Sequence, residues 1–147
     1  MDFHQALAVT LAELTPQPWD YTDGSGSTLT VIPAGLREEP GHAEVMIRIT
    51  ESHTQAAEVG VTTVDMPGLL DALTARSSWR HATSTADELA VTPNDDGSVI
   101  LAAVEVHYGP NARDGESAAE VRIPAGQRMP LVSALGRALD VARGWEH

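Results

Sequence analysis

The chain has 147 residues with no cysteine and no lysine, and nine arginines stand against 21 Asp and Glu for a net charge of −12. These counts exclude thiol catalysis, thiolate zinc sites, disulfides and lysine Schiff-base chemistry. The charge opposes binding to a phosphate backbone, because such binding depends on basic side chains that displace counterions. The length predicts a single domain, residues 1–147, and the lack of a long apolar run or signal sequence predicts a cytoplasmic protein without a membrane span.

The first half of the chain predicts three strands between two helices. Apolar residues recur at helical spacing from Phe3 to Leu14, which predicts an amphipathic helix within residues 1–14. After a proline-bounded turn, "TLTVIP", "AEVMIRIT" and "AEVGVTT" alternate between apolar and polar residues, as strands with one buried face do. "VDMPGLLDALTARSSW" predicts a helix that begins near Asp65, with Pro67 in its first turn. Residues 28–78 therefore form a first βββα half.

The same order returns over residues 88–145. "ELAVTP", "VILAAVEVHY" and "AEVRIP" predict three more strands, and "MPLVSALGRALDVARGW" predicts a closing helix. The offset between the halves is nearly constant, at 62 residues from Glu58 to Glu120 and 63 from Met66 to Met129. We therefore predict an α+β fold, a two-layer sandwich in which the N-terminal helix and two βββα units pack helices on one face of a largely antiparallel sheet.

An apolar group is predicted on the outer face of that sheet. On the strand that starts at Val99, alternation directs Val104 and Val106 toward the core and places the intervening residues outside. Contiguous apolar residues on an outer face mark protein–protein contacts. The alternative is a sheet edge covered by the N-terminal helix or by the 109–117 loop. The predicted partner-binding residues are Ile32, Met46, Val99, Leu101, Glu105 and His107.

The motifs of the chain predict no catalytic, cofactor or metal site. "DGSGS" at 23–27 precedes a strand and lacks a basic anchor, and "NDDGS" at 94–98 lacks the spacing of a calcium loop, so both are interpreted as turns. Glu105 and His107 are two residues apart on one strand, which suggests an acid–base pair or, alternatively, a solvated surface of alternating charge. We expect a protein that is not an enzyme, and the alternative is a small ligand-binding protein or enzyme that uses the face of Glu105 and His107.

The order of the elements resembles the class I type III secretion chaperones and the YbjN-like proteins. The likeness rests on "FHQALAVTLAEL", "PGLLDAL", "NDDGSVILAAVEV" and "LGRALDVARGW", and it spans nearly the whole chain. It implies a chaperone- or adaptor-like homodimer that binds an extended segment of a partner polypeptide. The acidic charge adds the expectation that this partner is basic and that nucleic acid is not bound.

A second segment, "IPAGLREEPGHAEVMIRI", is similar to part of the SsgA-like sporulation proteins of actinobacteria. The fold of those proteins is related to that of the Whirly single-stranded nucleic-acid binders, whose two βββα-type halves would account for the internal repeat. This resemblance implies, as the alternative function, a factor in cell division or sporulation.

Overall fold

The computed structural model describes residues 18–34, 44–83, 85–107 and 115–144, which form two antiparallel sheets and two helices. Sheet A consists, in this order, of β1 (Trp19–Thr22), β2 (Thr28–Ile32), β3 (Glu44–Ser52) and β4 (Gln55–Thr62). Sheet B consists of β5 (Trp79–Ala82), β6 (Glu88–Pro93), β7 (Val99–His107) and β8 (Gly115–Ile123). Helix α2 (Met66–Ala75) follows sheet A, and helix α3 (Ala125–Gly144) follows sheet B.

The predicted single sheet of two βββα units is wrong, because each half contains a fourth strand and forms a sheet of its own. The two missing strands, β1 and β5, are four residues long and begin with Trp19 and Trp79. The sequence around β1 suggests a proline-bounded turn, and the sequence around β5 suggests the end of a helix. Four residues show too few alternations between apolar and polar side chains to reveal a strand. The predicted N-terminal helix, residues 1–14, lies outside the described residues.

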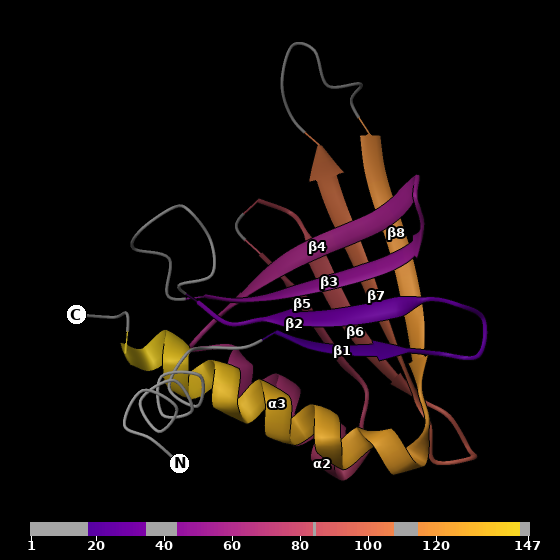
Figure 1. The fold of residues 1–147 in the computed structure, drawn as a ribbon. Coiled ribbons are helices and arrows are strands. Elements are labelled where there is room, and N and C mark those ends of the chain that lie inside the picture. Colours follow the sequence, from indigo (N-terminus) through magenta and orange to yellow (C-terminus); the bar gives the residue numbers. More distant parts are fainter. Residues whose placement is uncertain (1–17, 35–43, 84, 108–114, 145–147) are drawn as a thin grey trace, which may run out of the picture.

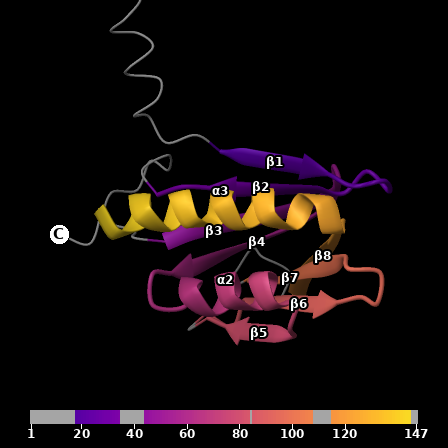
Figure 2. The ribbon, with the colours of Figure 1, turned by 90° about the horizontal axis from the view of Figure 1, so that it is seen from below.

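The two sheets cross each other, and the helices fill the space between them. In Figure 1 the strands of sheet A run across those of sheet B, and β3 and β4 contact β7 and β8. Figure 2 shows both helices on one side of the sheets, where α2 packs on β5 and β6 while α3 packs on β2 and β3. Each half therefore covers the sheet of the other half with its helix.

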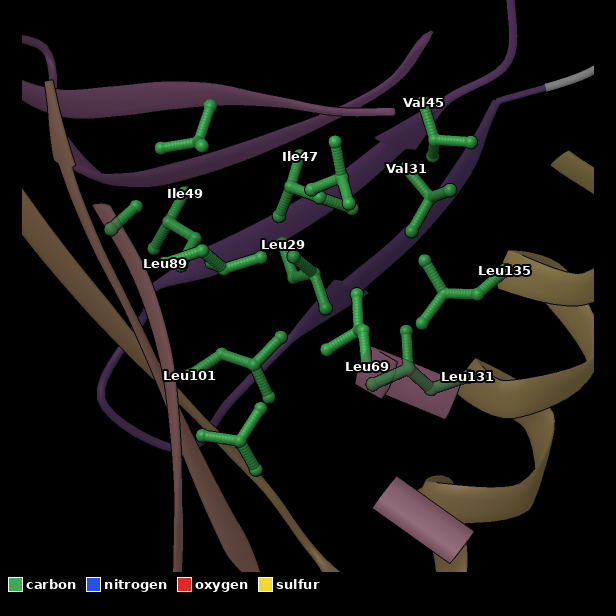
Figure 3. Close-up of a cluster of buried hydrophobic side chains, with 14 of the residues drawn as sticks. Leu29, Val31, Val45, Ile47, Ile49, Leu69, Leu89, Leu101, Leu131 and Leu135 are labelled. Carbon is green, nitrogen blue, oxygen red and sulfur yellow. The ribbon is translucent and has the colours of Figure 1, made fainter. Parts of the chain in front are cut away.

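The core lies where the inner faces of both sheets meet the helices (Figure 3). The inward orientation predicted for β3 and β4 is confirmed, because the alternating valines and isoleucines of these strands are fully buried. Sheet B and the helices complete the same cluster. Its large side chains include Leu29, Ile47, Ile49, Leu69, Leu89, Leu101, Leu131 and Leu135, all with an exposed fraction of 0%.

The two faces of β7 are reversed relative to the prediction. Val99, Leu101 and Ala103 are fully buried, whereas Val104 and Val106 lie half-buried on the outer face. The segment "VILAAV" is apolar on both faces, so alternation alone does not orient it. Val99 and Leu101 are core residues, and their predicted place on an outer surface is wrong.

Helix α3 begins four residues earlier than predicted, at Ala125 instead of Met129. Pro130 therefore lies inside the helix and leaves the carbonyl of Gly126 without its usual amide partner. In α2, by contrast, Pro67 lies at the start of the helix, where no such bond is required. Within the described ranges, neither helix has the length and apolar character needed to cross a membrane.

Candidate functional site

The six predicted partner-binding residues do not form one surface. Ile32 and Met46 are opposite each other on β2 and β3, on the outer face of sheet A. Met46 lies over Gly60, where a Cβ atom would be 3.1 Å from its sulfur, and this contact leaves Met46 only 9% exposed. Val99 and Leu101 are in the core, so a partner that touched the outer pair could not reach them.

Glu105 and His107 each contact a different residue at the junction of the sheets. Glu105 Oε1 accepts a hydrogen bond of 3.1 Å from the backbone N–H of Glu58 in β4. His107 Nε2 lies 2.6 Å from Ser117 Oγ in β8. The part of the chain that the structure describes contains no group of three His, Asp or Glu side chains that could hold a metal ion. The structure thus gives both side chains partners that join neighbouring strands.

Three side chains of the first half, one from the turn between β1 and β2 and two from strands β3 and β4, hydrogen-bond to the outer edge of β8, and we call them the edge clasp. Alternate residues of an edge strand direct their backbone groups outward, and unpaired groups at such an edge would invite association with another strand. The clasp occupies three successive outward positions of β8. Its contacts are Asp23 Oδ2 with the N–H of Arg122 (3.0 Å), Glu51 Oε1 with the N–H of Glu120 (3.2 Å) and Gln55 Nε2 with the carbonyl of Ala118.

The pKa of Asp23 in the edge clasp lies below its ordinary value. Burial alone would raise this pKa, but N–H and O–H donors from Arg122, Ser25 and Ser27 stabilise the carboxylate and outweigh burial. The guanidinium of Arg122 also pairs with Asp96, a carboxylate whose own pKa is lowered by hydrogen bonds from Ser98. The turn that contains Asp23 and the turn that contains Asp96 therefore both contact Arg122.

The outer face of sheet A is rich in hydroxyl groups. The even-numbered residues of its strands point away from the core, as the alternating burial of the four strands shows. Arg48, in the middle of β3, pairs with Glu58 at 3.0 Å, and its side chain is 48% exposed. The face also carries the carboxylates of Asp20, Glu44 and Glu58. Some of its threonine hydroxyls hydrogen-bond within the chain, Thr22 with Thr28 and Thr62 with Asp65. The threonines of this face are Thr22, Thr28, Thr30, Thr50 and Thr62.

Each of the two short strands carries a stacked pair of rings. The ring centroids of Trp19 and Tyr21 are 6.5 Å apart in β1, and those of Trp79 and His81 are 5.8 Å apart in β5. All four rings are partly buried. Trp79 lies so close to α2 that a Cβ atom on Gly68 would be 2.9 Å from the indole nitrogen. The repeated pairs therefore cover the core at the two open margins of the sheets.

A hollow of about 230 Å³ lies beside the edge clasp, over β7 and β8. Small apolar residues, Ala102, Val104 and Ala118, line it. Glu51 and Glu120 line it as well, so that two carboxylates border an apolar surface. Because Glu51 comes from sheet A and the other residues from sheet B, the hollow exists only where the two sheets meet. We call it the junction hollow.

Comparison with known proteins gives matches among solved structures alone. No protein family matches the sequence, and no curated protein matches it. Crystal structures of Trypanosoma brucei MRP1/MRP2 match with a TM-score of 0.64 and 19% identity, covering 100% of this chain and 99% of that one. A guide-RNA-binding protein complex bound to a guide RNA matches with a TM-score of 0.62 and 18% identity, covering 94% and 99%. The plant transcriptional regulator PBF-2 matches with a TM-score of 0.58 and 13% identity, covering 89% and 86%.

These neighbours are Whirly-fold proteins, and the chain described here has the same fold. The resemblance to type III secretion chaperones and YbjN-like proteins is therefore wrong, and a chaperone-like protein-binding role loses its basis. The second resemblance, through the SsgA-like proteins, implies a Whirly-related fold and agrees with the structure. The expectation that nucleic acid is not bound, drawn from the acidic charge and the few aromatic residues, is overturned as well, because a neighbour of this fold is bound to guide RNA.

Strands β1 and β5 carry a sequence signal for this fold. Trp19 and Trp79 are 60 residues apart, as are Pro33 and Pro93. Both pairs fall at the same places in the two halves, at the start of the first strand and at the end of the second. Extending the repeat upstream from the prolines to the tryptophans would have predicted four strands in each half.

Proposed function

We propose that this chain is a binding protein for single-stranded nucleic acid and not an enzyme. The observation that carries the proposal is the match, over 94% of this chain, to a guide-RNA-binding complex with guide RNA bound. Single strands expose the faces and edges of their bases, so a protein binds them by stacking and hydrogen bonding without entering a groove.

The outer face of sheet A supplies the contacts expected for the sugar–phosphate backbone. Threonine hydroxyls donate hydrogen bonds to phosphate and sugar oxygens without a formal charge. Arg48 adds one cation in the middle of this face, where it is paired with the carboxylate of Glu58. Since the chain as a whole carries a charge of −12, long-range attraction to phosphate is absent and these short-range contacts have to hold the strand.

This mode of binding has a measurable signature. A protein that neutralises many phosphates loses affinity steeply with salt, with a slope of about −0.7 per phosphate for single strands. One arginine on the binding face predicts a slope no steeper than about −1. The test is the fluorescence anisotropy of a labelled single strand of about 20 nucleotides, compared with a duplex of the same sequence, between about 50 and about 200 mM salt. We expect binding to the single strand and not to the duplex.

A pair of arginine variants locates the surface. Arg48→Gln removes the cation from the outer face of sheet A, whereas Arg137→Gln removes the same charge from an exposed position on α3. Weaker binding by Arg48→Gln alone is the expected result. Equal effects of the two variants, or no binding of any single strand by the wild type, would refute the proposal.

The charge of the chain favours a second candidate, a factor in cell division or sporulation like the SsgA-like proteins. A net charge of −12 repels phosphate, and a role of this kind does not require phosphate binding. The test is the position of a fluorescently tagged chain in dividing and sporulating cells. Accumulation at division sites, together with no binding in the anisotropy assay, would favour this candidate over the first.

A further inference from the structure

We propose that the junction hollow binds a guanine base, with Glu51 and Glu120 as the acceptors for its Watson–Crick edge. This inference rests on the proposed function and assigns a base preference to it. It also gives the acidic side chains of the junction a role, because carboxylates repel phosphate but accept hydrogen bonds from bases.

The size and lining of the hollow suit one flat ring. A volume of about 230 Å³ is smaller than the pockets of about 300–1,000 Å³ that hold drug-sized ligands. Ala102 and Ala118 leave room above the strands, and Val104 adds a branched apolar side chain beside them. A base can therefore lie against these side chains with one of its faces removed from water.

The two carboxylates are placed at the rim by the sheet junction. Glu51 is anchored by the hydrogen bond of 3.2 Å that its Oε1 accepts from the N–H of Glu120. The side chain of Glu120 lies on the outer face of β8, directly across from Ala102 in β7. The hollow thus brings an anchored and an exposed carboxylate next to the same apolar floor.

Carboxylates accept hydrogen bonds and donate none, and this property selects among the bases. Guanine presents two adjacent donors, N1–H and the N2 amino group, on its Watson–Crick edge. Adenine and cytosine place a ring-nitrogen acceptor next to their amino group, and uracil flanks its single N–H with two carbonyl oxygens. These acceptors would face the carboxylate oxygens and be repelled. Guanine is the one base that satisfies both acceptors of a carboxylate at once.

The first measurement compares strands that differ in one base. The probes are oligouridine strands of about 12 nucleotides with a single central guanine or a single central adenine, titrated by fluorescence anisotropy. We expect the guanine strand to bind about tenfold more tightly, the lower range for a good two-donor contact. Glu120→Gln should remove this preference without weakening the binding of oligouridine, because an amide offers one acceptor oxygen where the carboxylate offers two. Asp140→Asn, at an exposed position on α3, removes one negative charge away from both surfaces and is the charge-matched control, which should keep the preference for guanine.

The second measurement separates this inference from the proposed function. Free guanosine is titrated into the full chain, and the backbone amide resonances of Ala102 and Ala118 are followed, with adenosine as the comparison. Shifts with guanosine but no binding of any strand would keep the guanine site and refute the proposed function. Binding of all strands with equal affinity, and no guanosine shifts, would keep the function and refute the guanine site. Neither binding nor shifts would refute both.

Discussion

Ala86 adopts a backbone conformation that glycine adopts at the equivalent turn of the first half. Its φ is 69°, and that of Gly26 is 92°. The two turns close with the same pair of contacts, since the N–H of Gly26 bonds to the carbonyl of Asp23 and the N–H of Ala86 bonds to that of Thr83. For any residue other than glycine this left-handed region costs about 1–2 kcal/mol.

We predict that Ala86→Gly raises the free energy of unfolding by about 0.5–1 kcal/mol. The gain is smaller than the full conformational cost, because glycine loses more backbone entropy when the chain folds. The measurement is the midpoint of urea unfolding at an unchanged slope. Gly26→Ala is the reverse control: the space around its Cβ is open, so the expected loss of about 1 kcal/mol comes from the backbone alone. Lower stability of Ala86→Gly would contradict this interpretation of the turn.

At the scale of elements, the edge clasp joins sheet A to β8 through a carboxylate that titrates. Because the pKa of Asp23 lies below the ordinary 3.8, its hydrogen bonds contribute fully to stability above that value. The contribution is lost as the pH falls through the lowered pKa. When the pH is lowered from about 6 to about 2.5, we predict that the free energy of unfolding falls less for Asp23→Asn than for the wild type.

The measurement is urea unfolding across this pH range, together with hydrogen exchange of the Arg122 amide. In the wild type that amide should exchange faster, relative to other β8 amides, as acid protonates Asp23. Asp20→Asn, on the outer face of β1, is the charge-matched control. If both variants flattened the pH profile equally, the effect would be one of net charge and not of the clasp.

The elements also show where sequence reasoning succeeds and fails. Strand β4 alternates strictly and β3 does so except at Met46, so their buried faces could be predicted and are confirmed. Strand β7 is apolar on both faces, so tertiary packing alone orients it, and β1 and β5 are too short to show a period of their own. In the sequence these two strands are marked by the repeat spacing of Trp19 and Trp79. The outward placement of Ile32 and Met46 follows from alternation. The edge clasp cannot be predicted from alternation, because Asp23 and Arg122 are 99 residues apart and come together only where the two sheets cross.

At the scale of the whole molecule, the exchange of helices makes the two halves depend on each other. Helix α2 belongs to the first half and packs on β5 and β6, and α3 belongs to the second half and packs on β2 and β3. A half that unfolded would therefore take its helix away from the sheet of the other half. Both sheets also share one hydrophobic core, so we expect the described strands to unfold in one cooperative step.

Leu135→Ala in α3 tests this dependence. Leu135 is 0% exposed within the shared core, so we predict that the substitution lowers the free energy of unfolding by about 2–5 kcal/mol. We further predict that the amides of β3, in the first half, lose protection from hydrogen exchange to the same extent as those of β7, in the second half. Ser133→Ala, on the exposed side of the same helix, is the control and should change stability by less than about 0.5 kcal/mol. Loss of protection confined to residues 88–107 and 115–144 would mean that the second half unfolds alone, because only independent halves could lose one sheet and keep the other.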